Sequence, residues 1–401
     1  MSAPVLWYVH HHGVGHWRRA LAVTRHLARP VVLASTAAPP AALPGNARWL
    51  RLPPDAPAVG PGHADAGARG LLHWAPQHQH GLLRRHRLLL AAVAVERPAV
   101  GVVDVSVEVT VLLRVSGLPV VGVRLPGDRR DDPHRLGFGL SEAVVMPVPR
   151  AWGLHHPDAV PARGDEGARA TTVEPVGLVT ALDVRPRVPG GHDGQGGPGG
   201  LSGLSGLSGP DPDGTVCVIV GRGGTTLDVA ACATLARAFP ARTVVALGEL
   251  APGRSTADRP LPANLRLVGR VDDPTPFLVD ARVVVGNTGL GTVADVAAAG
   301  RPFVTCPERR PFGEQDTTAQ ALARTGGAVV VRAGAGTSAW RDAVLHAERE
   351  QCMPPPPTGA ATMAAAIERA VAGTGPLRRP ALEDLDGLDA LGGPAVSRAR
   401  A

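Results

Sequence analysis

Residues 283–322 constrain the fold of this chain more than any other stretch. They begin with a short apolar run that ends in glycine, the pattern of a buried parallel strand. A turn of small residues at 287–291 leads into an Ala/Val-rich run, which the Gly-Arg-Pro sequence at 300–302 ends. Residues 303–305 then have the pattern of the next strand. The stretch therefore predicts a strand–turn–helix–strand unit of an α/β fold.

The start of this predicted helix is suited to bind a phosphate group. The first amide N–H groups of a helix have no acceptor within the helix, and the helix dipole places positive charge there. We interpret the turn as the site of a nucleotide diphosphate. A structural interpretation stays open, because Thr292 and Asp295 also fit a capping box in which the carboxylate bonds to the first turn.

The same stretch resembles the donor site of GT-B glycosyltransferases, specifically the family of the lipid-II-forming N-acetylglucosaminyltransferase and its UDP-glycosyltransferase relatives. The family's pattern is a small-residue turn, a Thr or Ser, an acidic residue three positions later, Gly-x-Pro and a downstream Gln or Asp-Gln, where this chain has Glu-Gln-Asp at 314–316. The resemblance implies an α/β GT-B fold, in which two Rossmann-like doubly wound parallel-sheet domains face a cleft. The positions that match the donor site are Asn287, Thr288, Gly289, Leu290, Gly291, Thr292, Asp295, Gln315 and Asp316.

The resemblance also assigns roles within this donor site. It implies that the turn holds the diphosphate, that Asp295 accepts hydrogen bonds from ribose hydroxyls, and that Gln315 or Asp316 holds the donor sugar. The family usually has Glu where this chain has Asp295, which is shorter by one methylene. Either the helix lies closer to the ribose here or the site is weaker.

The N-terminal segment predicts a second α/β unit. Residues 4–9 and 31–34 have the pattern of buried strands, and 18–27 has an apolar stripe of helical period between them. This strand–helix–strand order predicts a parallel sheet with crossover helices.

The loop at 10–16 carries four histidines and resembles the glycine-rich acceptor loop of the same family. His16 falls on the family's His and could remove a proton from the acceptor hydroxyl, because the pKa of imidazole lies near neutrality. Alternatively, His16 caps the helix or bonds to a carbonyl. No Asp, Glu or Cys adjoins these histidines, so we predict no metal site there. The acceptor side is expected to comprise His12, Gly13, Gly15 and Asp104, the last at the end of the predicted strand 99–103.

The composition excludes several classes of function. The chain has no lysine, so it can form neither a Schiff base nor a P-loop. Its four cysteines form no Cys-x-x-Cys pair, which favours a reducing cytoplasm over a zinc or disulfide framework. The net charge of +6 comes without aromatic-flanked basic patches, so we predict no nucleic-acid partner. No signal peptide and no apolar run of the ~18–20 residues that span a membrane is apparent.

A linker divides the chain. Residues 189–214 are mainly Gly, Pro, Ser and Asp, with a triple Leu-Ser-Gly repeat, and cannot bury enough apolar surface to fold. We therefore predict an acceptor domain at 1–185, a flexible linker at 186–214, a nucleotide-sugar domain at 215–375 and a loosely ordered tail at 376–401.

The second domain begins with a strand at 216–220 and a glycine-rich turn at 221–226. This turn lacks the full dinucleotide fingerprint, which disfavours NAD. By resemblance, the residue at Val271 borders the donor base. Two literal Asp-x-Asp matches, at 211–213 and 384–386, are poorly placed for a metal at the leaving group, so we predict metal-independent transfer and no cofactor. The further donor-side candidates are Gly223, Gly224 and Thr225.

Two acceptor-domain segments receive weaker interpretations. Residues 82–95 predict a helix with a basic cluster; we expect its leucines on the sheet and its arginines in water, although contact with anionic lipid stays open. Residues 124–139 are polar and predict an acceptor-side loop.

Together these features predict a glycosyltransferase that moves a hexose-type sugar from a nucleotide diphosphate, with UDP favoured, to an acceptor that the sequence does not identify. A lipid-linked glycan, a cell-wall precursor and a small molecule all stay open, as does peripheral contact with the cytoplasmic face of the membrane. Two alternatives are a nucleotide-sugar 2-epimerase and a non-catalytic GT-B homologue that binds a partner.

Overall fold

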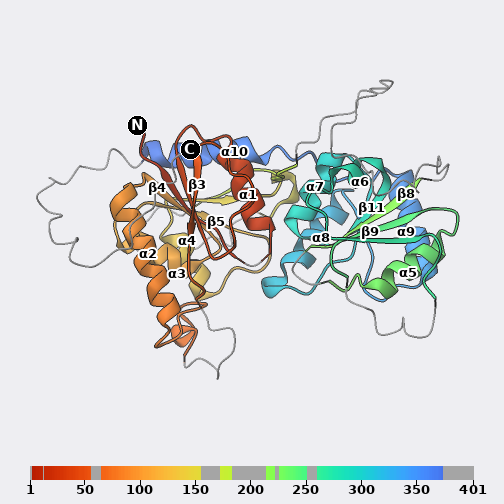
Figure 1. The fold of residues 1–401 in the computed structure, drawn as a ribbon, viewed down its shortest axis with the longest axis horizontal. Helices are drawn as coiled ribbons and strands as arrows, with labels where there is room; N and C mark the ends of the chain where they lie inside the picture. The colour runs from red at the N-terminus through yellow and green to blue at the C-terminus, as the bar shows by residue number, and fades with distance from the viewer. Residues whose placement is uncertain are drawn as a thin grey trace, which may run out of the picture.

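The chain folds into two α/β domains in a computed structural model, which describes residues 2–11, 13–55, 65–154, 172–182, 214–221, 225–250 and 260–373 (Figure 1). In the N-terminal domain, seven strands form one sheet in the order β3-β2-β1-β4-β5-β6-β7, and every pairing is parallel. The strands are β1 (Val5–Tyr8), β2 (Val31–Ser35), β3 (Ala47–Arg51), β4 (Val100–Asp104), β5 (Val120–Val123), β6 (Ala143–Met146) and β7 (Val173–Pro175). The helices are α1 (Gly15–Thr24), η1 (Ala68–Gly70), α2 (His80–Glu96), α3 (Val107–Val115), α4 (Asp132–Gly139) and η2 (Arg150–Trp152).

The C-terminal domain repeats this plan with six parallel strands in the order β10-β9-β8-β11-β12-β13. The strands are β8 (Thr215–Ile219), β9 (Val244–Leu247), β10 (Leu265–Gly269), β11 (Ala281–Gly286), β12 (Phe303–Thr305) and β13 (Val329–Val330). The helices are α5 (Val229–Ala238), α6 (Thr275–Asp280), α7 (Leu290–Ala299), η3 (Pro311–Gly313), α8 (Glu314–Arg324), α9 (Thr337–Arg349) and α10 (Gly359–Gly373). Both sheets reverse their strand order beside the first strand, so the predicted doubly wound GT-B architecture is confirmed.

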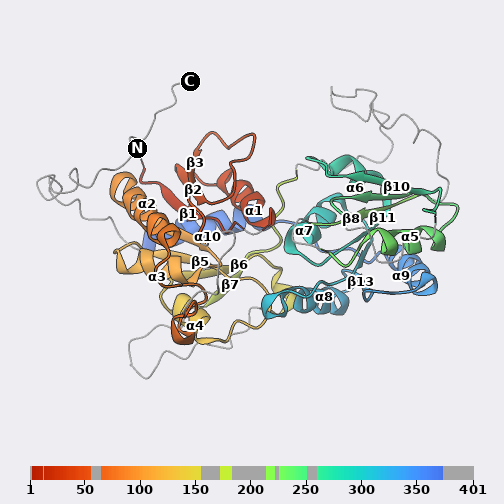
Figure 2. The same cartoon turned by 60° about the horizontal axis from the view of Figure 1, so that its bottom comes forward.

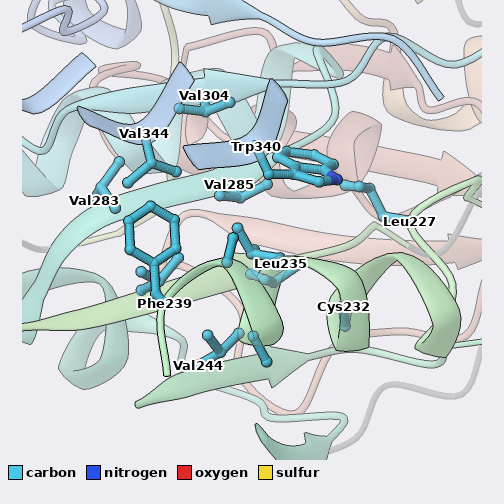
Figure 3. Packing of buried hydrophobic residues seen from close by; sticks show 14 of the residues in the cluster. Leu227, Cys232, Leu235, Phe239, Val244, Val283, Val285, Val304, Trp340 and Val344 are labelled. Atoms are coloured by element: carbon cyan, nitrogen blue, oxygen red, sulfur yellow. The ribbon is translucent and has the colours of Figure 1, made fainter. Parts of the chain in front are cut away.

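Aliphatic side chains fill both cores, as expected for a chain with few aromatics. On one face of the C-terminal sheet, Leu235 and Phe239 of α5 pack with Trp340 and Val344 of α9 against valines of the strands (Figure 3). Because helices cover both faces of a parallel sheet, its strands are apolar on both sides, which explains the continuous valine runs. Within the described residues, no helix combines the length and the apolar character needed to cross a membrane.

The last described helix belongs to the first domain. The side chains of Met363 and Ile367 in α10 are buried in the N-terminal core, and α10 lies along α1 (Figure 1). Gly359 makes this return close: its N–H donates to the Leu178 carbonyl at 2.8 Å, and a Cβ there would lie 2.3 Å from the Gly177 oxygen. The predicted C-terminal domain 215–375 is therefore corrected, because 359–373 packs on the N-terminal sheet. Residues 183–213 and 374–401, which hold almost all of the predicted linker, the tail and both Asp-x-Asp matches, lie outside the described residues.

Two local predictions for the acceptor domain are wrong in part, although Arg84 and Arg87 of α2 are exposed as expected. The segment 124–139 contains α4, whose first turn Asp131 caps by accepting from the His134 N–H at 3.2 Å. In α2, Arg85 is buried and donates to the Tyr8 hydroxyl at 2.6 Å, whereas Leu83 is 58% exposed. The arginine lies inside because the hydroxyl and the nearby Asp55 carboxylate satisfy its charge.

Candidate functional site

The turn before α7 holds its shape through Asn287, which is buried. The Asn287 side-chain oxygen accepts from the Gly289 N–H at 3.1 Å and from the Thr292 hydroxyl at 3.3 Å. Gly289 is the N-cap residue, and no side chain caps the helix. The first amides of α7 therefore have no side-chain acceptor, and Asp295 does not close the capping box that the sequence allows.

This uncapped helix start faces the N-terminal domain. A Cβ on Gly291 would lie 3.7 Å from the Cα of Gly15, the first residue of α1. Figure 2 shows α7 beside α1 where the two domains meet. The starts of two helices, each with the positive end of its dipole, therefore meet at the domain boundary.

Asp295 is engaged across this boundary. Its carboxylate accepts from Arg18 of α1 at 3.0 Å and from the Thr180 hydroxyl at 2.6 Å. Burial raises the pKa of Asp295, and the opposing effects of Arg18 and Thr180 do not overcome it. In this arrangement each carboxylate oxygen already has a protein donor, so a ribose would have to share Asp295 with Arg18 or displace it.

The residues matched to the donor sugar lie in different environments. Gln315 is buried: its Oε1 accepts from the Glu308 N–H at 2.9 Å, and its carbonyl accepts from the Thr288 hydroxyl at 2.8 Å. Gln315 therefore ties the α7 turn to the start of α8. Asp316 is exposed to solvent.

Glu308 binds the end of the second glycine-rich turn, residues 221–226. Its buried carboxylate accepts from the Thr225 hydroxyl at 2.9 Å and from the Thr226 N–H at 2.7 Å. Gly223 and Gly224 lie outside the described residues. Val271 is partly buried and packs against the cluster that contains Leu290 of the α7 turn. The structure thus brings the described part of this turn to the same end of the sheet as α7.

On the acceptor side, His16, Arg19 and Asp104 form one buried cluster. His16 Nδ1 lies 3.1 Å from Asp104 Oδ2, and Arg19 donates to both carboxylate oxygens at 2.9 and 2.8 Å. Asp104 is the last residue of β4 and is fully buried. Burial alone would raise the pKa of Asp104, but Arg19 and His16 together hold it well below its usual range.

His16 Nδ1 lies 3.1 Å from the Asp104 carboxylate, which can only accept a hydrogen bond, and 3.1 Å from the Arg19 guanidinium, which can only donate one. When the proton of the neutral ring is on Nδ1 and is donated to Asp104, Nε2 carries the free electron pair that a general base needs. His10 packs against His16 with ring centroids 5.2 Å apart. Gly13 adopts a left-handed φ of +74°, and a Cβ at Gly13 or Gly15 would meet nothing within 4 Å; His12 lies outside the described residues.

Sequence reasoning missed the residues that reach between the domains. Arg18 and Thr180 bind Asp295, and Arg129 lies 3.5 Å from Glu314 at the start of α8. Burial raises the pKa of Glu314, and the positive charge of Arg129 opposes this rise. The chain has 41 arginines and no lysine, so a single arginine in the sequence does not indicate a functional role. The Glu-Gln-Asp motif contained Glu314, but we assigned its role to the two residues that follow.

A second histidine cluster lies in the acceptor domain. His73 Nε2 is 2.8 Å from Asp131 Oδ2, and His134 Nδ1 makes a short contact with Asp131 Oδ1. Arg129 lies 3.1 Å from His134 Nε2 and can only donate there, so the His134 proton lies on Nδ1 and points to Asp131. Among the described residues these three form a group close enough for metal ligation, but their polar atoms are already paired with one another and with Arg129.

Part of the C-terminal domain matches a known protein family. Residues 264–370 match the model of the glycosyltransferase family 28 C-terminal domain. Because the match includes β11, α7 and α8, the predicted glycosyltransferase and its suspected family are confirmed at this level. Among curated proteins, none matches the chain.

Solved structures share the fold of the whole chain at low identity. A UDP-glucosyltransferase from Polygonum tinctorium is similar with a TM-score of 0.57 and 14% identity, covering 93% of this chain and 99% of its own. MurG from Acinetobacter baumannii gives 0.55 and 14%, covering 92% and 100%. UGT2 from Phytolacca americana, complexed with UDP-2fluoro-glucose and pterostilbene, gives 0.55 and 15%, covering 92% and 94%. Both domains of the chain therefore share the GT-B fold.

Proposed function

We propose that this glycosyltransferase moves a hexose-type sugar from UDP to a hydroxyl group of its acceptor, without a metal ion. The observation that carries the proposal is the meeting of two elements at the domain boundary: the uncapped start of α7 and the His16–Asp104 pair. UDP is favoured because the similar enzymes from Polygonum tinctorium and Phytolacca americana are described with UDP or a UDP-sugar.

In the proposed reaction, His16 Nε2 takes the proton of the acceptor hydroxyl as its oxygen attacks the anomeric carbon. The bond from that carbon to the diphosphate oxygen breaks, and the UDP leaves with the electron pair. Amides at the start of α7 stabilise the charge that develops on the diphosphate. Asp104 stabilises the imidazolium that forms at His16. Because the attack and the departure occur on opposite sides, the proposed reaction inverts the anomeric carbon.

Metal independence rests on the chemistry of this site. The dipoles of α7 and α1 both place positive charge near the α7 turn, whereas Arg18 and Arg19 are paired with Asp295 and Asp104. The test measures transfer with added Mg²⁺, with added Mn²⁺ and after chelation. Equal rates in all three support the proposal, whereas a rate that collapses on chelation would contradict it.

The donor is tested by titrating a panel of UDP-sugars and free nucleotides while recording the thermal midpoint. A ligand that binds the folded protein raises the midpoint by mass action. We expect UDP and at least one UDP-sugar to raise it, and we expect Asp295→Ala to reduce that effect. Identical responses of wild type and Asp295→Ala to every compound would remove Asp295 from the donor site.

The two alternatives are distinguished by analysing the products after incubation with nucleotide-sugars, with and without acceptors. Conversion of UDP-N-acetylglucosamine to an isomeric nucleotide-sugar without acceptor would indicate an epimerase, which the transferase family match disfavours. Saturable binding of a UDP-sugar without turnover across a broad acceptor panel would indicate a non-catalytic homologue.

We further propose that the enzyme works in the cytoplasm, with α2 lying on the inner membrane face. One face of α2 exposes Leu83, Leu90 and Val95 together with Arg84 and Arg87. Such a face suits an anionic interface. Co-sedimentation with anionic vesicles but not with neutral ones would support this location, and equal recovery in the supernatant would contradict it.

A further inference from the structure

A short segment of the C-terminal domain, residues 310–314, crosses to the acceptor domain. The Asp128 N–H donates to the Phe312 carbonyl at 2.8 Å. Gly127 makes this approach possible, because a Cβ there would lie only 2.3 Å from the same oxygen. Gly127 also has a φ of +102°, which side chains other than glycine rarely adopt. The backbone contact between the domains therefore depends on a glycine.

Phe312 is held in an unusual conformation by this contact. Its φ of +61° lies in the left-handed region, an outlier for a bulky residue. Its ring lies 4.4 Å from the Arg129 guanidinium and 4.8 Å, edge-on, from the His134 ring. His73 adds a third ring at 5.5 Å. Since these partners all belong to the acceptor domain, the strained conformation is compensated when the domains are together.

Arg129 makes two contacts across the domain boundary. It is 8% exposed, and besides the Phe312 ring it lies 3.5 Å from Glu314 Oε2. Burial raises the pKa of Glu314, while Arg129 opposes the rise. Arg129 thus joins η3 and the start of α8 to the acceptor domain, and the same domain contact places Gly291 of α7 beside Gly15 of α1.

We infer that Arg129 is a positioning residue, which seats Phe312 and holds Glu314 at the acceptor domain, so that the start of α7 stays beside the helix that carries His16. The inference rests on the proposed function. It assigns Arg129 to closure and to the chemical step rather than to nucleotide binding, since the α7 turn is held by Asn287 and Gln315 instead.

The kinetic test is a double-mutant cycle on Arg129→Met and Glu314→Gln. We expect each variant to lower kcat at least tenfold while the Kd of UDP changes less than twofold. The double variant should be no slower than the worse single one, because both remove the same interaction. Arg129→Lys should fall between wild type and Arg129→Met, since an ammonium keeps the charge but not the planar fork. Independent, multiplicative losses, or a loss confined to UDP binding, would overturn the inference.

The control is Arg114→Met, which removes an exposed arginine of α3 and should leave kcat unchanged. If a thermal midpoint falls equally in Arg114→Met and Arg129→Met and kcat falls in neither, Arg129 has no positioning role.

A second measurement does not require activity, so it separates this inference from the proposed function. Gly127→Ala and Phe312→Ala should both increase the radius of gyration in X-ray scattering, because each removes part of the contact between the domains. Gly139→Ala is the matched glycine control, since a Cβ there meets nothing within 4 Å. Unchanged radii for both variants, with circular dichroism showing folded protein, would refute the inferred contact between the domains even if transfer is observed. Failure of wild type to bind any nucleotide-sugar would refute the proposed function and leave the inferred contact unaffected.

Discussion

Arg18→Met is predicted to destabilise the protein more than Asp295→Asn, although the two side chains form one ion pair. Asp295 is 4% exposed, whereas the Arg18 side chain is 25% exposed. Removing Arg18 leaves a buried carboxylate without its cation. Removing the charge of Asp295 leaves an arginine that can turn toward water.

The magnitudes follow from this asymmetry. Loss of one partner of a buried ion pair costs about 3–5 kcal/mol, and the retained Thr180 hydrogen bond reduces this to about 2–3 kcal/mol for Arg18→Met near neutral pH. Asp295→Asn keeps an oxygen that accepts from Thr180, so its expected cost is about 1 kcal/mol or less.

The two costs should differ in their dependence on pH. The folded-state pKa of Asp295 is raised by burial, so ionisation of this group opposes folding above the unfolded-state pKa. Without Arg18 the folded-state pKa rises further. The cost of Arg18→Met is therefore fully present above the folded-state pKa that Asp295 has in the variant. It shrinks as the pH falls from there toward the unfolded-state pKa of Asp295. The cost of Asp295→Asn should instead fall as the pH rises, because the variant lacks the penalty that ionisation of Asp295 places on the wild type.

The assay is urea denaturation of wild type, both single variants and the double variant at pH 5 and pH 8, analysed for the first transition of this two-domain chain. The double variant should match Asp295→Asn. A cost for Asp295→Asn equal to that of Arg18→Met, or a cost for Arg18→Met that is the same at both pH values, would refute the reasoning.

His16→Asn should lower kcat about 10²–10⁴-fold, the usual contribution of a general base, with the Kd of UDP unchanged in calorimetry; a loss of UDP binding instead would place His16 on the donor side. Asp104→Asn should lower kcat as well, because an amide can hold His16 in the wrong tautomer, and a wild-type rate would remove Asp104 from the pair. Burial raises the pKa of Cys217 and of Cys232 to about 12, so a thiol reagent should modify both only as the protein unfolds, and rapid labelling of the native protein would contradict their burial.

The fold could be predicted from sequence because its signals are local and repeat. Valine runs followed by small-residue turns mark parallel strands that end at one edge of a sheet, and both domains carry several of them. The α4 helix was missed although Asp131 and Pro133 form a recognisable helix start, because the polar sequence around them suggested a loop. The return of α10 to the first domain was misplaced because a helical period does not say which sheet the helix covers.

The site was less predictable because its contacts join residues far apart in the chain. His16 and Asp104 each had a local signal, one a loop histidine and the other a strand end, but their contact depends on the order of β1 and β4 in the sheet. Arg18 lies on the helix that carries His16, yet nothing in that helix indicates a bond to Asp295, which is 277 residues away. Pairings of this kind depend on how the two domains meet, which no single segment encodes.

The most direct measurement is an NMR titration of protein labelled with ¹⁵N at glycine, leucine and threonine with UDP. Amide protons that bind a diphosphate move strongly in their chemical shifts, because they exchange water for a charged acceptor. The account predicts that the largest changes occur at Leu290, Gly291 and Thr292, with small changes at Gly15 across the boundary. Saturable UDP binding that leaves these three amides unmoved would contradict it.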